Sequence, residues 1–221
     1  MSRFTWTICA AVAVLLLALT RGAQAQSTAS EQGSPTRGRE PMQTHGLFLG
    51  VGAGQTVLDS DVLLPPDEGR IAVAGRVGYG FGNYIALVVS GDLTRVDLTL
   101  DSEEGEFEFA HIALSARIHP FRTWGRVGPF IEGSWLRYAA TTDRAAPSAT
   151  VATRLTLEGT GAAAGAGVHV FLTRALSLEA SAALTDGKFS KATGAAVSGP
   201  FDDIPLRSRL YRLGLTWWLG T

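Results

Sequence analysis

The sequence predicts an all-β protein, a closed antiparallel up-and-down transmembrane β-barrel of about eight strands behind a cleaved signal peptide. Three observations indicate this fold class. From residue 46 onward, stretches of about ten residues alternate between apolar and polar side chains, as barrel strands do. Long and short links separate these stretches in turn, and single charges occupy the polar faces of most of them.

Residues 1–25 have the features of an export signal. Arg3 provides a positive start, residues 8–19 are almost uninterruptedly apolar, and residues 23–25 are a small-x-small cleavage sequence. A membrane-spanning helix needs about 20 apolar residues, so a cleaved signal is favoured over a retained anchor. The only cysteine, Cys9, would leave with it, so we expect no disulfide and no cysteine metal site.

Residues 26–45 are predicted to be a flexible periplasmic lead, because this segment is rich in Ser, Thr, Gly, Pro and Gln and has no apolar period. The barrel is then expected over residues 46–221. The net charge is −1, and nothing in the chain forms the basic stripe that a nucleic-acid partner would favour. The four histidines have no metal-ligand spacing, so we expect no metal and no cofactor.

Eight stretches alternate strongly enough to be strands. In the second, Ile71, Val73 and Val77 share one face while Ala72 and Arg76 share the other. The predicted strands are residues 46–57, 71–81, 84–96, 107–119, 126–138, 159–171, 176–184 and 210–219.

The links between these strands are expected to alternate in length. The long ones are residues 58–70, 97–106, 139–158 and 185–209; the short ones are residues 82–83, 120–125 and 172–175. Transmembrane barrels have short periplasmic turns and longer outside loops, whereas a soluble sandwich has no reason to keep this alternation.

Six charges lie on the polar faces of six separate predicted strands. Outward side chains of a membrane barrel must be apolar, so these charges are expected to point into the lumen. Three are cations and three are anions, which favours a paired network that closes the lumen, because an isolated buried ion costs several kcal/mol. The alternative is a set of solvated charges on a soluble sheet. The residues are Arg76, Asp92, Arg117, Glu132, Glu179 and Arg212.

The last predicted strand carries a polar residue, a glycine two positions later, and alternating hydrophobic residues: Arg212, Gly214, Trp217 and Leu219. With the eight alternating stretches, this strand resembles the small OmpA-type and opacity-type porin-like barrels of Gram-negative bacteria, over residues 46–221. Members often end on a phenylalanine, whereas this chain continues to Gly220 and Thr221.

That resemblance implies placement in the bacterial outer membrane, contact with outer-membrane lipid and lipopolysaccharide, and a monomeric barrel. It also implies that the last strand is an assembly signal for the barrel-assembly machinery. An aromatic girdle is expected at the periplasmic interface, formed by Tyr79, Phe81, Tyr84, Phe121, Trp124, Trp217 and Trp218.

Three functions are compatible with such a barrel. The favoured one is a non-enzymatic structural or surface-interaction protein with a closed lumen; the alternatives are a narrow pore or small-ligand passage, and a lipid-A-modifying enzyme. An enzyme is disfavoured because His111 and Ser115 are separated by about 13 Å along a strand. The His-x-Ser spacing of the lipid-A deacylases is also missing from the sequence.

Overall fold

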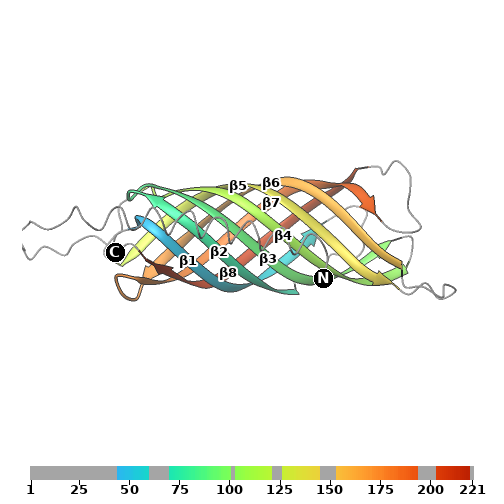
Figure 1. Cartoon of the computed structure of the whole chain (residues 1–221), viewed down its shortest axis with the longest axis horizontal. Coiled ribbons are helices and arrows are strands. Elements are labelled where there is room, and N and C mark those ends of the chain that lie inside the picture. The colour runs from blue at the N-terminus through green and yellow to red at the C-terminus, as the bar shows by residue number, and fades with distance from the viewer. Residues whose placement is uncertain are drawn as a thin grey trace, which may run out of the picture. The chain divides into compact units, whose positions relative to one another are not determined.

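The barrel is closed by eight antiparallel strands. The computed structural model describes residues 44–59, 70–100, 103–120, 126–144, 153–193 and 203–219. Each strand pairs with its neighbour in chain order, and β8 pairs with β1 (Figure 1), which confirms the predicted fold class. The strands are β1 (Gly46–Asp59), β2 (Arg70–Phe81), β3 (Ile85–Leu100), β4 (Glu103–Ile118), β5 (Val127–Arg144), β6 (Thr153–Phe171), β7 (Leu176–Thr193) and β8 (Ile204–Trp218).

The predicted signal peptide and all of the predicted lead except Thr44 and His45 lie outside the described residues. Among the residues that are described, no helix is long and apolar enough to cross a membrane.

Pairing between the first and last strands removes every free sheet edge. Their register runs from Phe48 opposite Trp218 to Asp59 opposite Arg207. In hydrocarbon an unpaired backbone group costs several kcal/mol, so closure is the condition for spanning a membrane with strands.

We call the two rims of the barrel the turn end and the loop end. The turn end holds the links β2–β3, β4–β5 and β6–β7; the loop end holds the links β1–β2, β3–β4, β5–β6 and β7–β8. The β2–β3 turn is a tight one in which Gly82 has a φ of 70°, a left-handed value that favours glycine.

An apolar belt surrounds the outside of the barrel. Ile71 on β2 is 79% exposed, Leu213 on β8 is 63% exposed and Leu114 on β4 is 53% exposed. From Ile71 to Phe81 the belt on β2 spans about 25 Å across the membrane, given the usual rise and tilt of barrel strands. This is the height of the apolar band of outer-membrane barrels.

The strands are longer at the loop end than the alternation predicted. The predicted strand 176–184 continues to Thr193, and the predicted strand 210–219 begins at Ile204. The link predicted at residues 97–106 shrinks to residues 101–102, between β3 and β4. Predicted ends at Tyr84, His119 and Arg126 are also wrong by one residue. Pairing explains the longer strands: Thr185 faces Ser208 and Lys188 faces Pro205, so backbone hydrogen bonding continues beyond the apolar belt.

The polarity of the two faces inverts where the strands leave the apolar belt. On β8, Leu213 and Tyr211 point outward, but the next outward residues toward the loop end are Arg209 and Arg207. The inward residues change in the opposite sense, from Arg212 to the buried Leu210 and Leu206. This part of the barrel has the pattern of a soluble barrel, with apolar side chains inside and polar ones outside.

Candidate functional site in the lumen

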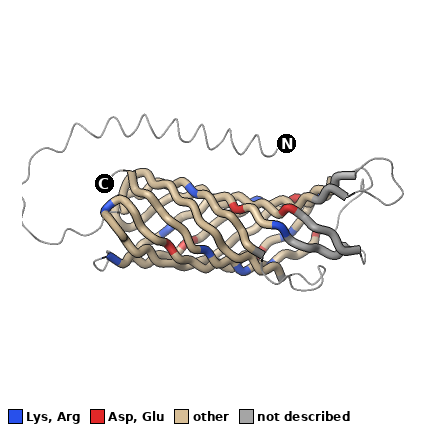
Figure 2. The backbone as a smooth tube through the Cα atoms, turned by 90° about the horizontal axis from the view of Figure 1, so that it is seen from below, with Lys and Arg blue, Asp and Glu red and all other residues tan. Residues whose placement is uncertain are grey.

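The six predicted charges all lie on the inner face, and the structure divides them into two groups. Glu179 on β7 forms ion pairs with Arg76 on β2 and with Arg117 on β4, where Arg117 Nη1 lies 3.0 Å from Glu179 Oε2. Arg117 also donates to Glu132 Oε2 through Nη2 at 2.7 Å and Nε at 2.8 Å. Figure 2 shows cations and anions interspersed along the barrel wall.

The second group joins β8 to β3 across the lumen. Arg212 donates to both carboxylate oxygens of Asp92, through Nε at 2.8 Å and Nη2 at 2.6 Å. His111 Nε2 lies 2.9 Å from the same carboxylate. Such fork-to-fork pairing is the strong form of an arginine–carboxylate contact, because it makes two parallel charge-assisted hydrogen bonds.

Burial makes these pairs energetically important. Glu179 is 1% exposed, Arg117 is 2% exposed and Asp92 is 4% exposed. With three charges of each sign the set is neutral, so each ion has a partner that offsets the desolvation of its charge.

Two glycines on the inner face, Gly50 and Gly167, make room for large side chains. A Cβ on Gly50 would lie 2.7 Å from the Arg76 side chain, and a Cβ on Gly167 would lie 2.4 Å from the Phe130 ring. Phe130 in turn lies beneath Arg117, whose guanidinium carbon is 3.8 Å from the ring centroid.

Sequence analysis missed a cluster of aromatic side chains that fills the turn end of the lumen. The Phe48 and Trp218 rings are 4.6 Å apart between centroids, and Phe171 lies 6.2 Å from Trp218. His169 joins the cluster, with its ring 5.6 Å from Trp218 and 5.1 Å from Phe130. All of these residues occupy the alternate positions that face the lumen on their strands. The two-residue period of each strand is therefore the signal that would have identified them.

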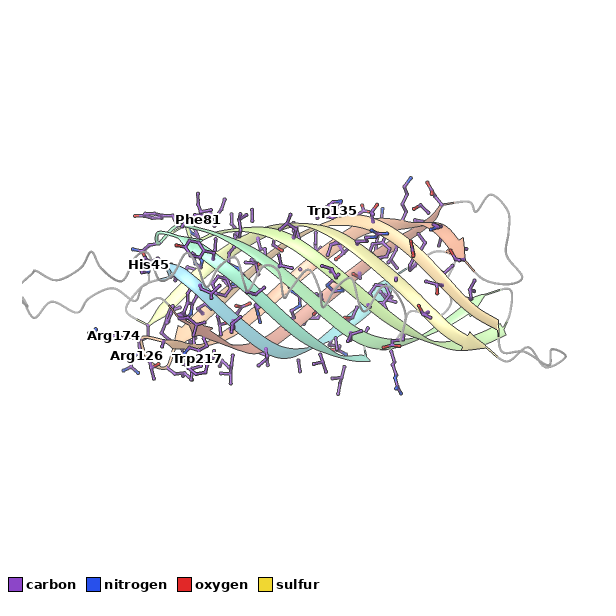
Figure 3. All side chains as sticks on the ribbon, in the orientation of Figure 1. His45, Phe81, Arg126, Trp135, Arg174 and Trp217 are labelled. Carbon is purple, nitrogen blue, oxygen red and sulfur yellow. The ribbon has the colours of Figure 1, made fainter. Side chains whose placement is uncertain are left out.

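The predicted interfacial girdle is wrong at Trp218, which faces the lumen. Trp218 is 1% exposed and its indole Nε1 donates to Ser177 Oγ at 3.2 Å, whereas Trp217 is 58% exposed on the outside. Figure 3 shows Trp217 and Phe81 near the turn end, with their side chains outside the ribbon. Successive residues of a strand point to opposite faces, so two adjacent tryptophans cannot both reach the interface.

A third cluster fills the loop end of the lumen with apolar side chains. The cluster was not expected, because Leu58, Ala140, Leu157, Phe189 and Leu206 lie outside the predicted strands. Phe189 of β7 is fully buried, and its ring stacks edge-on against Tyr138 of β5 at 5.1 Å. The buried members are Leu58, Phe109, Ala113, Leu136, Tyr138, Ala140, Leu157, Phe189 and Leu206.

The structure separates the Ser–His pair considered from the sequence. Ser115 Oγ lies 2.8 Å from Ser134 Oγ, while His111 contacts Asp92. A different pair is in contact: Ser177 Oγ is 3.3 Å from His169 Nδ1, and both residues are completely buried. No substrate can reach that serine in this conformation. Among the described residues, no group of three or more His, Cys, Asp or Glu could hold a metal ion.

The residues of the predicted assembly motif lie on both faces of β8. Arg212 and Gly214 face the lumen, where a Cβ on Gly214 would lie 2.8 Å from Arg76 Nη2. Trp217 and Leu219 are exposed on the outside. Their role as a signal for the assembly machinery stays a prediction.

The fold is that of small bacterial outer-membrane barrels. Surface protein A of Neisseria has a TM-score of 0.59 and 16% identity, over 78% of this chain and 96% of that one. The attachment invasion locus protein of Yersinia pestis has a TM-score of 0.51 and 15% identity, over 78% and 98%.

The outer membrane protein OprG of Pseudomonas aeruginosa has a TM-score of 0.52 and 12% identity, over 78% and 95%. No protein-family model and no curated protein matched the sequence. The closed barrel, its apolar belt and this likeness identify the chain as a transmembrane barrel of the outer-membrane type.

Proposed function

We propose that the protein is a non-enzymatic outer-membrane scaffold with a closed lumen, and that its activity lies at the loop end. One observation carries this proposal: buried side chains occupy the lumen at three successive levels. These are the aromatic cluster with Phe48 and Trp218, the charged groups around Glu179 and Asp92, and the apolar cluster with Phe189.

Each level opposes a pore in its own way. An ion would have to displace packed aromatic rings, enter a network whose charges are already paired, and then pass an apolar constriction that excludes water. Eight-stranded barrels have interiors just wide enough for side chains to fill. A lipid-modifying activity is also disfavoured, because the Ser177–His169 pair is enclosed within the lumen.

We assign the surface-interaction role to the loop end of the barrel, which the strands hold outside the membrane. Loops carried by a rigid framework are the usual site of binding. Two barrels of the same fold have names that refer to a surface or to attachment: surface protein A and the attachment invasion locus protein. The segments concerned here, residues 60–69, 101–102, 145–152 and 194–202, lie outside the described residues.

Planar-bilayer recording tests the closed lumen. The purified barrel, shown to be folded by heat-modifiable migration on gels, is expected to give no steady conductance, because all three levels must open together. A general porin reconstituted at the same protein-to-lipid ratio is the positive control. Repeatable conductance steps from the folded barrel would support the pore alternative and contradict the proposal.

A further inference from the structure

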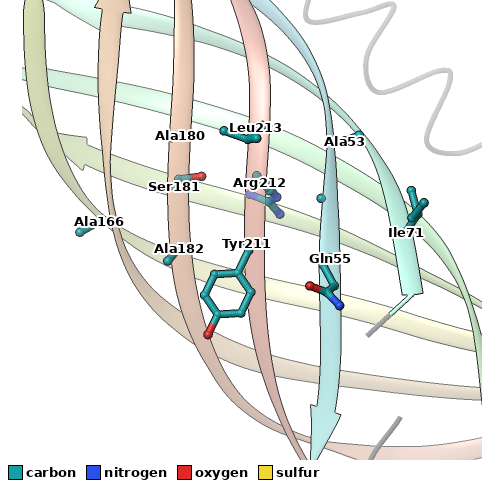
Figure 4. Close-up of a pocket in the computed structure, with 11 residues that line it drawn as sticks. Ala53, Gln55, Ile71, Ala166, Ala180, Ser181, Ala182, Tyr211, Arg212 and Leu213 are labelled. Carbon is teal, nitrogen blue, oxygen red and sulfur yellow. The ribbon is translucent and has the colours of Figure 1, made fainter. Parts of the chain in front are cut away.

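A groove on the outer face of the barrel has the shape and chemistry of a lipid site. It has a volume of 660 Å³ and lies along both sides of the outward side chains Tyr211 and Leu213 of β8 (Figure 4). The small residues Ala166, Ala180 and Ala182 line one side. Ala53, Gln55 and Ile71 line the other side.

The groove is hollow because its walls alternate between large and small outward residues. Register places Ala182 beside Tyr211 and Ala180 beside Leu213 on one flank. Gln55 and Ala53 occupy the corresponding positions on the other flank. Tyr211 is 48% exposed and Leu213 is 63% exposed, so both rise as a ridge between two shallow channels. Unbranched acyl chains fit such channels.

The groove reaches the loop-end margin of the apolar belt. Arg209 is the next outward residue beyond Tyr211, about 7 Å along the strand. The outward residues change from apolar to basic between Tyr211 and Arg209 on β8. They do so between Leu93 and Arg95 on β3 and between Trp135 and Arg137 on β5. This margin is therefore the level of the outer-leaflet headgroups.

Arg209 differs in its surroundings from the other cations at this margin. Its register neighbours are the apolar Val57 and Leu184, whereas Arg207 lies opposite Asp186 on β7. Arg137 lies 3.6 Å from Glu158, which offsets its charge. Arg209 therefore lies between two apolar register neighbours, one outward position beyond Tyr211, which lines the groove.

We propose that this groove binds one molecule of lipid A, with acyl chains beside Tyr211 and Leu213 and a phosphate on Arg209. The site requires a ligand with several acyl chains and an anionic headgroup at the outer-leaflet level. Lipid A is the anionic lipid of that leaflet. The inference rests on the proposed outer-membrane placement and is independent of the closed lumen.

Native mass spectrometry of the purified barrel in detergent tests the proposal, with bisphosphorylated lipid A as the probe. We expect tighter retention of this probe than of dephosphorylated lipid A or phosphatidylglycerol. Arg209→Gln is expected to raise the Kd about tenfold, a loss of about 1.4 kcal/mol. Ala182→Phe, which fills one channel, should weaken binding by a similar factor. Arg137→Gln is the matched control and should leave the Kd within about twofold.

Heat-modifiable migration first establishes that every variant is a folded barrel, so failure of the outer-membrane fold is distinguished from failure of the lipid site. Equal binding by wild type, Arg209→Gln and Ala182→Phe would overturn the proposal, as would an equal loss in Arg137→Gln. Equal retention of phosphatidylglycerol or dephosphorylated lipid A would show a nonspecific lipid annulus instead. If the wild-type protein forms a dimer and the Ala182→Phe variant is monomeric, the groove binds a second copy of the chain. This result would also overturn the lipid site.

Discussion

Replacing Glu179 by glutamine is expected to lower the free energy of unfolding of the barrel by about 3–5 kcal/mol, because it leaves the buried Arg76 without its anion and Arg117 with Glu132 alone. Glu179 pairs with both Arg76 and Arg117 and is 1% exposed. Glutamine keeps the size of the side chain, so the loss reports the charge and not a cavity.

Urea unfolding of the barrel in lipid vesicles, followed by tryptophan fluorescence, measures this loss. Glu158→Gln is the matched control: its carboxylate is 28% exposed and lies 3.6 Å from Arg137, and such a pair is worth about 1 kcal/mol or less. The double variant Arg76→Met with Glu179→Gln should recover part of the stability, because the remaining charges balance again. Equal losses in Glu179→Gln and Glu158→Gln would contradict a network that depends on burial.

Replacing Phe189 by alanine is expected to cost about 3–5 kcal/mol, the usual loss for a fully buried phenylalanine. Phe189 is 0% exposed and contacts Tyr138 at the loop end of the lumen. The substitution leaves the apolar belt untouched, so the variant should still insert into the membrane.

The same unfolding measurement checks this result, and protease treatment of the membrane-inserted variant shows where the barrel loosens. Ser190→Ala changes the adjacent residue, which points outward and is exposed. It is expected to stay within about 0.5 kcal/mol of wild type, as surface substitutions usually do. A Phe189→Ala barrel as stable as Ser190→Ala would show that the loop-end cluster contributes nothing to stability.

Strand order and the facing of side chains were predictable because both depend on local pattern. A period of two identifies the two faces, and the six charges at Arg76, Asp92, Arg117, Glu132, Glu179 and Arg212 all have the inward parity that the sequence assigned to them. Strand ends were not predictable from polarity alone. Beyond Leu184 and before Leu210 the apolar face changes sides, so the pattern that identified a membrane strand no longer applies.

The partners of each charge in the lumen could be identified only from the closed barrel. Nothing in the sequence indicates that Arg212 meets Asp92 and not another carboxylate, because these residues are 120 positions apart and are joined only across the lumen. The buried Ser177–His169 contact and the aromatic packing around Trp218 have the same origin. Local pattern can place each side chain on a face but cannot give its height in the lumen.

By itself, the sequence determined that this protein is an up-and-down barrel with an apolar outer face and a neutral set of inward charges, because alternation and charge are local properties. The tertiary structure alone decided which charges meet, how far the strands continue beyond the membrane, and where the outer face is hollow. These depend on strand register and tilt, which bring distant residues to one level only when the sheet closes.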